Sequence, residues 1–280
     1  MKKSLLPAAC LFIIFIVSTA LGQTPAPGSV PKLRLGNTVK PVHYSLELSV
    51  TPTDDTFSGV VDIEMDLREA TSLIWLNASE LTIKEAEIST GTLTIPAKLV
   101  LGNEDFLGFS LDSSIGPGPA KLHILYKGKI NSVDTYGVFK QKEGIDWYAF
   151  SQFESIYARR AFPCFDEPSF KVPWQLTLHV KQEYVALSNT PIISETNEPN
   201  GMKVVKFSET KPLPSYLVAF AVGPFEIVDA GKVGKKATQV RIITPRGKTT
   251  YAEYAAKTTP QILTLLENYF GIPYPYEKLD

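Results

Sequence analysis

Cysteine and histidine are scarce in this sequence. Of its 280 residues, two are cysteines, Cys10 and Cys164, and three are histidines, His43, His123 and His179. Cys10 lies in an N-terminal apolar segment that we expect to be removed, which leaves one cysteine and excludes an internal disulfide. The fold therefore has to be stabilised by a hydrophobic core. The histidines are far apart and lack the spacing of metal ligands, which argues against a zinc site built from them.

Several motifs of nucleotide-binding enzymes and serine hydrolases are also missing. The chain contains no Gly-rich phosphate loop, no Gly-rich dinucleotide turn and no Gly-x-Ser-x-Gly elbow. Its net charge of −1 gives no reason to expect a nucleic-acid partner. No repeat of fixed period is present, which argues against a solenoid or a propeller. With 44% hydrophobic and 20% charged residues, the composition is that of a folded globular protein.

The N-terminal part of the chain is expected to be a targeting segment followed by a linker. Lys2 and Lys3 precede an apolar, uncharged run over residues 5–17, and Ala20-Leu21-Gly22 supplies the small residues of a cleavage site. This pattern predicts a signal peptide over residues 1–22 and an exported protein, periplasmic or extracellular. An uncleaved membrane anchor is the alternative, although the run is marginal against the ~20 apolar residues of a spanning helix. Residues 23–33 form a Pro-rich linker.

From about residue 41 to residue 225 the dominant hydrophobic period is two, the period of a strand with one buried face. Short polar turns separate these runs and no helical pattern lies between them, so we predict antiparallel sheets. The alternating positions include Val42, Tyr44, Leu46 and Leu48, then Val61, Ile63, Met65 and Leu67, and later Trp174, Leu176, Leu178 and Val180. One run differs, because residues 216–222 (YLVAFAV) are continuously apolar, which predicts a strand buried on both faces.

The hydrophobic period becomes helical near residue 250. Apolar and aromatic residues follow at spacings of three and four from Tyr251 to Tyr269. Pro260 interrupts this pattern, so we expect Thr259 to cap a new helix there and Gly271 to end it. A β domain over residues 34–227 is therefore followed by a second domain over residues 228–280. We expect that second domain to be incomplete, because so short a segment cannot close a core of its own.

Residues 151–168 (SQFESIYARRAFPCFDEP) are the most informative segment of the chain. Its two prolines exclude a regular ladder of hydrogen bonds through the segment. Arg159 and Arg160 stand near Asp166 and Glu167 in sequence. Such a set indicates an irregular loop held by charge-assisted hydrogen bonds, so we predict that these four residues build the loop.

The segment resembles the T-Q-x-E-x-x-x-A-R-R-x-F-P-C-x-D-E-P stretch of the M1 (aminopeptidase N type) zinc aminopeptidases. Further segments are similar to other parts of that family, and they occur in the family's order along most of residues 34–280. They are RLGNTVKPVHYSLEL (34–48), FSGVVDIEMDL (57–67), IWLNASELTI (74–83), LHILYKGKI (122–130) with YGVF (136–139), KPLPSYLVAFAVGPFE (211–226) and YFGIPYPYEKLD (269–280). The sequence departs from the family at Tyr157, where many members have Asp, at Ser151, where Thr is usual, and at Gly36, where Pro is frequent.

The resemblance implies a mainly β fold, in which a saddle-like, antiparallel multi-sheet N-terminal domain precedes the truncated beginning of a thermolysin-like α/β catalytic domain. It also implies that Glu154 binds the free α-ammonium of a peptide substrate and that Gln152 lines the same subsite. A carboxylate in a closed pocket distinguishes a charged chain end from an internal amide, because the amide leaves that charge unpaired. For Gln152, a supporting role behind the pocket is an equal alternative, and a solvated carboxylate is the ordinary role of a glutamate.

Zinc is the cofactor that the resemblance implies, but the sequence lacks the family's metal-binding motif. The Gly-x-Met-Glu-Asn strand and the His-Glu-x-x-His helix do not occur in the 280 residues. We therefore expect the full-length enzyme to remove single N-terminal residues from peptides with a free N-terminus, and this chain by itself to be inactive. The alternative is a non-catalytic exported β-sheet module that binds a partner.

Two further features have structural rather than chemical interpretations. Cys164 is expected to be a small buried residue, because nothing near it in the sequence would activate a thiolate. Asn77-Ala78-Ser79 matches an N-glycosylation acceptor, a short pattern that also arises by chance.

Overall fold

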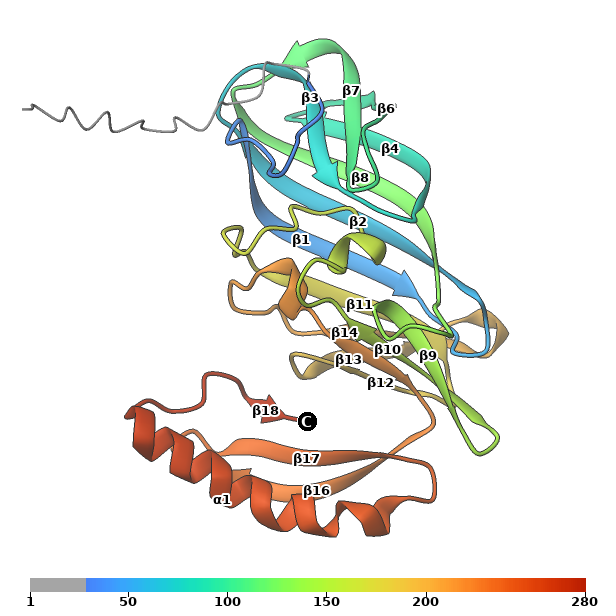
Figure 1. Ribbon diagram of the computed structural model, residues 1–280, viewed down its shortest axis with the longest axis vertical. Coiled ribbons are helices and arrows are strands. Elements are labelled where there is room, and N and C mark those ends of the chain that lie inside the picture. The colour runs from blue at the N-terminus through green and yellow to red at the C-terminus, as the bar shows by residue number, and fades with distance from the viewer. Residues whose placement is uncertain (1–28) are drawn as a thin grey trace, which may run out of the picture.

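The computed structural model describes residues 29–280 of the chain. The predicted signal peptide and the first part of the linker, residues 23–28, lie outside the described residues. Strands dominate the described part, where they form four sheets, and one α-helix lies near the C-terminus (Figure 1). The prediction of a mainly β, multi-sheet fold is confirmed. Within residues 29–280, no helix combines the length and the apolar character that a membrane span requires.

An eight-stranded sheet is the largest layer of the fold (Figure 1). Burial alternates along its central strands, as the period of two predicted, and the inner face carries the core. In spatial order the strands are β13 (Ile192–Asn197), β14 (Met202–Phe207), β11 (Trp174–Lys181), β1 (Val39–Ser49), β2 (Thr56–Leu67), β8 (Gly118–Lys129), β4 (Thr82–Thr90) and β5 (Leu93–Pro96).

One pair of strands in this sheet is parallel, which differs from the antiparallel prediction. β1 and β11 run in the same direction, with Tyr44 paired to Trp174 and Leu48 paired to Leu178. Parallel pairing needs a crossover connection, and the long chain between β1 and β11 provides one. The prediction failed here because it considered only strands joined by short turns. The parallel register stacks the buried rings of Tyr44 and Trp174 with their centroids 3.9 Å apart.

A three-stranded sheet lies beside one end of the eight-stranded sheet and shares its core. It consists of β3 (Thr71–Asn77), β7 (Phe106–Ile115) and β6 (Lys98–Leu101). Buried residues of β3 and β7 belong to the same hydrophobic cluster as those of β1, β2 and β8. One continuous core therefore holds the two sheets together.

A four-stranded sheet connects this part to the C-terminus, in the order β12 (Val185–Ser188), β15 (Phe220–Gly223), β10 (Asp146–Gln152) and β9 (Gly137–Glu143). The predicted buried strand over residues 216–222 is confirmed only from Phe220 onward and is wrong for the residues before it. Ser215–Leu217 is a 3-10 turn, η3, and β15 begins only at Phe220, with Leu217 47% exposed. The Asn189 side chain donates to the carbonyl of Leu217 and accepts the N–H of Ala219, so these backbone groups are satisfied without a ladder.

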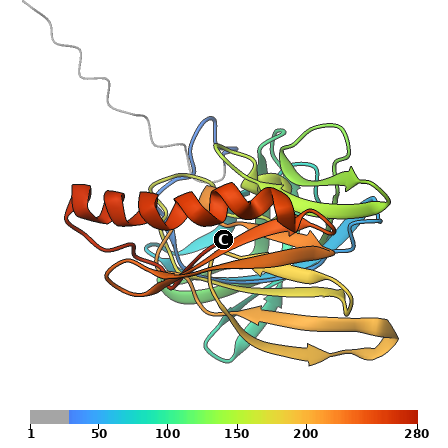
Figure 2. The same cartoon turned by 90° about the horizontal axis from the view of Figure 1, so that it is seen from below.

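The C-terminal unit is a three-stranded sheet with helix α1 (Glu253–Phe270) beside it (Figure 2). Its strands are β16 (Phe225–Val233), β17 (Thr238–Pro245) and β18 (Lys278–Leu279), and β18 is parallel to β17. Two short 3-10 turns, η2 (Pro199–Gly201) and η4 (Thr249–Ala252), precede β14 and α1. The predicted domain boundary between residues 227 and 228 lies inside β16, whereas the chain passes from one sheet to the next between β15 and β16.

Helix α1 continues through Pro260, so the predicted new helix at Thr259 is wrong. Proline removes one N–H donor from the helix interior. The hydrogen bonds of the other turns remain, and the burial of Leu263 and Glu267 holds the second half of the helix against the sheet. The predicted end at Gly271 is confirmed, because this residue adopts the left-handed conformation at φ 72°.

The apolar face of α1 is not covered by any described residue. Tyr254 is 79% exposed, Leu265 is 66% exposed and Tyr269 is 81% exposed, although all three follow the helical period. The helix packs on β16 and β17 and buries Leu263 and Glu267. An exposed apolar surface of this kind is typical of a site that contacts another element of structure.

The buried carboxylate of Glu267 joins α1 to two loops. It accepts the N–H of Tyr274 at 2.7 Å and the N–H of Lys235 at 2.8 Å. Both bonds lower the pKa of Glu267, and the bond from Tyr274 has the larger effect. A carboxylate with a lowered pKa stabilises the fold above its unfolded pKa of about 4.3, and this contribution is lost as the pH falls through the folded value.

We expect Glu267→Gln to lower the melting temperature at pH 7, because an amide offers one acceptor oxygen and turns an N–H towards the second donor. The difference from the unsubstituted chain should shrink as the pH falls below about 4. Thermal unfolding at pH 7, 5 and 3 measures this, with the exposed Glu253→Gln on the same helix as the control. A difference that stays constant down to pH 3 would assign the effect to packing rather than to charge.

Candidate functional site

Residues 151–168 form an arm that leaves β10 and returns beside the end of β3 and the middle of β1. The arm turns through the 3-10 helix η1 (Ala158–Arg160). The ring of Phe153, 1% exposed, lies 5.4 Å from that of Phe162 and 6.3 Å from that of Phe220. These buried edge-to-face contacts fix the base of the arm on the core.

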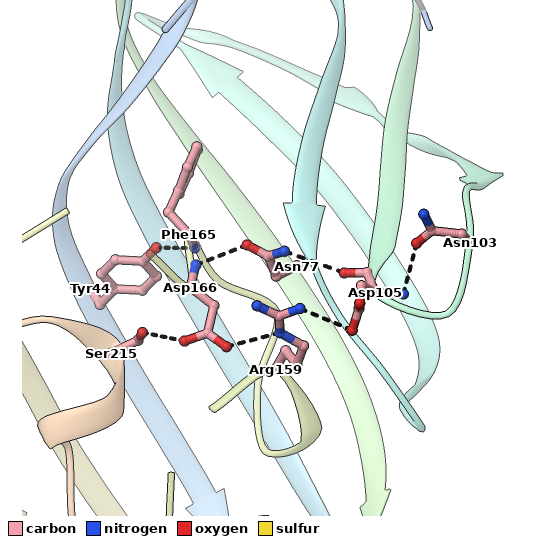
Figure 3. Close-up of polar contacts among 8 residues, drawn as sticks. All are labelled: Tyr44, Asn77, Asn103, Asp105, Arg159, Phe165, Asp166 and Ser215. Atoms are coloured by element: carbon pink, nitrogen blue, oxygen red, sulfur yellow. Dashed lines mark hydrogen bonds and ion pairs between the residues drawn. The ribbon is translucent and has the colours of Figure 1, made fainter. Parts of the chain in front are cut away.

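Arg159 lies at the centre of a buried polar network in the arm (Figure 3). Its Nε donates to Asp166 Oδ2 at 2.9 Å, and its Nη1 lies 2.9 Å from Asp105 Oδ1. The other oxygen of Asp166 accepts from Ser215 Oγ. Burial disfavours the charged guanidinium, but hydrogen bonds to Asp166 and Asp105 hold the pKa of Arg159 above its ordinary value. The charged Arg159 therefore ties the arm to the turn before β7.

Asn77 ties the arm to the end of β3. Its backbone exchanges two hydrogen bonds with Cys164, of 2.8 and 3.0 Å. Its side-chain oxygen accepts the N–H of Asp166 at 3.0 Å (Figure 3). Its side-chain nitrogen donates to the carbonyl of Asp105 at 3.4 Å, and the residue is 2% exposed. The amide of the glycosylation-like motif is thus engaged inside the fold, which excludes a glycan on the folded chain.

The sequence pattern did not reveal the residues that hold the arm from other segments. These are Asn77, Asp105, Ser215 and Tyr44, whose hydroxyl accepts the N–H of Phe165 at 3.0 Å. They are common residue types on separate strands and turns, and no spacing relates them to the arm. Only the packing of the sheets brings them together.

The second arginine and the last carboxylate lie at the edges of the arm. Arg160 forms a 3.1 Å ion pair with Glu80, and its guanidinium lies over the ring of Tyr157. That ring, where the family often has Asp, stacks on Tyr136 with 4.3 Å between centroids. Glu167 accepts a backbone N–H from the N-terminal segment at 2.7 Å. Of the four charged residues that were expected to build the loop, Arg159 and Asp166 pair with each other inside the arm. Arg160 and Glu167 instead bind residues outside it.

Gln152 and Glu154 lie where the arm leaves β10. Gln152 is the last residue of the strand and follows Phe150 by two positions, so both side chains leave the same face. Phe150 lines a cavity of about 690 Å³ between this sheet and the strands β17 and β18. Glu154 is exposed in the turn that follows. Within residues 29–280, its carboxylate has no hydrogen-bond or ion-pair partner.

Comparison with known proteins accounts for most of the chain. Residues 40–217 match the Peptidase M1 N-terminal domain. The chain belongs to the M1 peptidase family. It is 34% identical over 254 residues to Aminopeptidase M1-B of Oryza sativa subsp. japonica, 32% identical over 255 residues to the puromycin-sensitive aminopeptidase of Caenorhabditis elegans, and 32% identical over 268 residues to endoplasmic reticulum aminopeptidase 1 of Homo sapiens.

The matches cover most of this M1 chain but a small part of its relatives. They span 88%, 88% and 92% of the chain, and 28%, 27% and 28% of the rice, nematode and human proteins. The M1 chain therefore spans little more than a quarter of the length of these aminopeptidases.

The M1 family implies zinc in the full-length enzyme, but the described residues of this M1 chain do not fit that metal. Within residues 29–280, no group of three or more His, Cys, Asp or Glu side chains is placed to hold a metal ion, and a zinc site needs three or four such ligands. Each histidine instead lies beside a carboxylate: His43 is 2.9 Å from Glu209, His123 is 2.7 Å from Asp62, and His179 is 3.0 Å from Glu198.

Cys164 of the M1 chain is fully buried, as predicted. Burial raises the pKa of its thiol well above the ordinary value, so the unreactive protonated form persists at neutral pH. In a Cys10→Ser variant we expect no reaction with an aromatic disulfide reagent at pH 8 while the chain is folded, and one thiol released in guanidinium chloride. Absorbance of the released thiolate measures this, and rapid labelling of the folded chain would contradict it.

Proposed function

We propose that this chain is the N-terminal portion of an exported zinc metallo-aminopeptidase that removes single N-terminal residues from peptides. In this proposal the chain supplies the anchor for the substrate's α-amine, and the zinc and the groups that act on the peptide bond come from other parts of the full-length enzyme. Membership of the M1 family supports the reaction class. The names of the relatives from rice, nematode and human as aminopeptidases support it as well.

The observation that carries the proposal is the carboxylate of Glu154, which has no partner within the described residues and lies on a rigidly held part of the arm. The side chain is exposed and unpaired within the described residues. The arm next to it is held by the buried ring of Phe153 and by the Arg159–Asp166 ion pair. A charge presented on a rigid segment loses little conformational entropy when it binds a cation. The α-ammonium is the cation by which a peptide's free end differs from its interior.

Gln152 provides a second polar group beside this carboxylate. Its amide has both donor and acceptor atoms and is exposed at the end of β10. We place it along the subsite for the terminal residue, on the same face of the strand as the cavity-lining Phe150.

A carboxylate anchor explains the removal of one residue at a time. Glu154 is exposed within the described residues, and in this proposal the bound substrate and the rest of the enzyme exclude water from it. A substrate whose amine is acylated, or an internal peptide segment, then leaves the carboxylate without a partner. An unsatisfied neutral polar group costs about 1–3 kcal/mol, which is about 5- to 150-fold in binding, and an unsatisfied buried charge costs more. The anchor also ends the subsite, so the chain cannot thread further.

The test of the proposed function compares two substrates of the full-length enzyme. We expect an aminoacyl-anilide to be hydrolysed, its N-acetyl derivative to be stable, and a zinc chelator to abolish the activity. Equal hydrolysis of both compounds would remove the amine anchor from the proposal. A coding sequence that stops or enters an unrelated domain after Asp280 would favour the non-catalytic binding module, for which the uncovered apolar face of α1 would be a contact surface.

Residues 23–280 by themselves are expected to show no hydrolysis of an aminoacyl-anilide with added zinc, because the sequence contains no His-Glu-x-x-His motif. Release of the chromophore is compared with a no-protein blank and with the full-length enzyme at equal concentration. Turnover above the blank would place the catalytic groups in this chain.

Export follows from the N-terminal sequence pattern and is proposed on that basis. N-terminal sequencing of the protein recovered from the periplasm or medium tests it. A mature chain beginning at Gln23 supports cleavage of residues 1–22. An intact Met1 in the membrane fraction supports an anchor instead.

A further inference from the structure

A buried lysine joins the C-terminal unit to the four-stranded sheet. Lys278 of β18 is 9% exposed, and its Nζ donates to the carbonyl of Ser188 on β12 at 2.5 Å and to Asp280 at 2.6 Å. Asp280 accepts from two nitrogens of Arg241 at 2.7 and 2.6 Å. All four residues line the cavity of about 690 Å³ between the two sheets.

Burial distinguishes this contact from that of a second lysine, Lys211, which lies in the loop after β14 and also contacts the C-terminal unit. Lys211 Nζ donates to the carbonyl of Pro275 at 2.6 Å, but that contact is exposed. Burial lowers the pKa of Lys278, and the hydrogen bond to Asp280 opposes this shift. A buried ammonium that has lost its water has to keep its protein partners. One of those partners is a backbone carbonyl, so the contact defines the position of β18 against β12.

The sheet that Lys278 contacts is also the sheet that carries the arm. Ser188 of β12 pairs with Phe220 of β15, and Ala221 of β15 pairs with Phe150 of β10. β10 ends at Gln152, just before Glu154. Strands joined by hydrogen bonds move together, so a displacement of β12 relative to β18 displaces the start of the arm as well.

We propose that Lys278 is a positioning residue for the aminopeptidase reaction, which fixes the sheet carrying Gln152 and Glu154 relative to the C-terminal unit. This inference rests on the proposed function, in which the amine anchor and the zinc lie in different parts of one enzyme. A peptide held by its ammonium places its first peptide bond at a set distance from the anchor. A misplacement of about 1 Å between the two parts can therefore lower the rate about 100-fold.

The first test is the kinetics of Lys278→Met in the full-length enzyme. The methionine keeps an unbranched apolar side chain and removes the ammonium. We expect kcat/KM for an aminoacyl-anilide to fall by about 10- to 100-fold, with most of the loss in kcat. Lys278→Arg, which keeps a donor, should recover part of the loss. Lys211→Met is the matched control and should change kcat/KM less than about twofold, because exposed contacts contribute little. An unchanged kcat/KM in Lys278→Met overturns the inference.

A double-substitution cycle separates positioning from general damage. If Lys278 acts by placing Glu154, its substitution costs much less in a Glu154→Gln enzyme than in the unsubstituted one. The same fold loss in both backgrounds overturns the inference while leaving the proposed function intact. A silent Glu154→Gln, by contrast, overturns the amine anchor and this inference together.

A distance measurement tests the structural step in the chain itself. Spin labels are placed at two exposed positions, Gln141 on β9 and Tyr269 on α1, in a Cys10→Ser background in which Cys164 is buried. We expect a single narrow distance distribution that broadens with Lys278→Met and stays narrow with Lys211→Met. Equal widths for both variants overturn the positioning role, whatever the kinetics show.

Discussion

Glu154→Gln in the full-length enzyme is expected to lower kcat/KM for an aminoacyl-anilide by about 10- to 150-fold, because a hydrogen bond to a charged group contributes about 1.5–3 kcal/mol. Glutamine keeps the shape of the side chain and loses its charge. Glu154→Asp keeps the charge with a shorter reach, so an intermediate loss is expected. The melting temperature should not change, since the carboxylate has no partner within the described residues.

A matched control separates the position of Glu154 from the mere loss of a negative charge. Glu104 is exposed in the turn before β7, outside the arm, and Glu104→Gln should leave kcat/KM within about twofold. Initial rates over a range of substrate concentrations and thermal unfolding of each variant provide the measurements. Full activity of Glu154→Gln would contradict the anchor, and a loss explained by unfolding would give Glu154 a structural role instead.

Arg159→Met is expected to destabilise the chain by about 3–5 kcal/mol, because removing one partner of a buried ion pair leaves the other charge uncompensated. The side chain of Asp166 is 1% exposed and that of Arg159 is 10% exposed. Asp166 would keep the hydroxyl of Ser215 but lose the guanidinium. Methionine replaces the apolar stem of arginine, so the lost charge accounts for most of the effect.

The neighbouring arginine provides the control for this variant. Arg160 pairs with Glu80 at 3.1 Å, and the glutamate side chain is 54% exposed. A pair open to solvent contributes about 0–1 kcal/mol, so Arg160→Met should cost no more than about 1 kcal/mol. Urea unfolding followed by circular dichroism measures both variants. Equal costs for the two substitutions would show that the buried network does not hold the arm.

The strands could be predicted because their burial pattern is local. The alternation from Tyr44 to Leu48 corresponds to β1, and that from Val61 to Leu67 corresponds to β2. Val42 was predicted wrongly: it is 49% exposed, because an irregularity between Pro41 and His43 shifts the register of β1. The end of α1 at Gly271 was predictable for the same reason, since a helix end depends on one residue's backbone. The continuous helix through Pro260 was not, because packing outside the helix compensates for the missing donor.

Only the contacts between residues of the arm itself could be predicted from the sequence. Arg159 and Asp166 are seven residues apart, so their charges could be related from the sequence. Asn77 is 89 residues from Asp166 and Ser215 is 49 residues from it, and neither carries a signal of its own. Such contacts arise from the order of strands within sheets, which hydrophobic periodicity does not encode.

The sequence by itself determined the strand period, the end of the helix and the motifs that relate the chain to M1 peptidases. The tertiary structure alone decided that β1 and β11 are parallel, that no residue within 29–280 covers the apolar face of α1, and that Lys278 reaches the carbonyl of Ser188. The physical reason is the range of the interactions. Backbone conformation and strand amphipathicity are properties of neighbouring residues, whereas the partner of a buried charge depends on segments that meet only when the sheets pack.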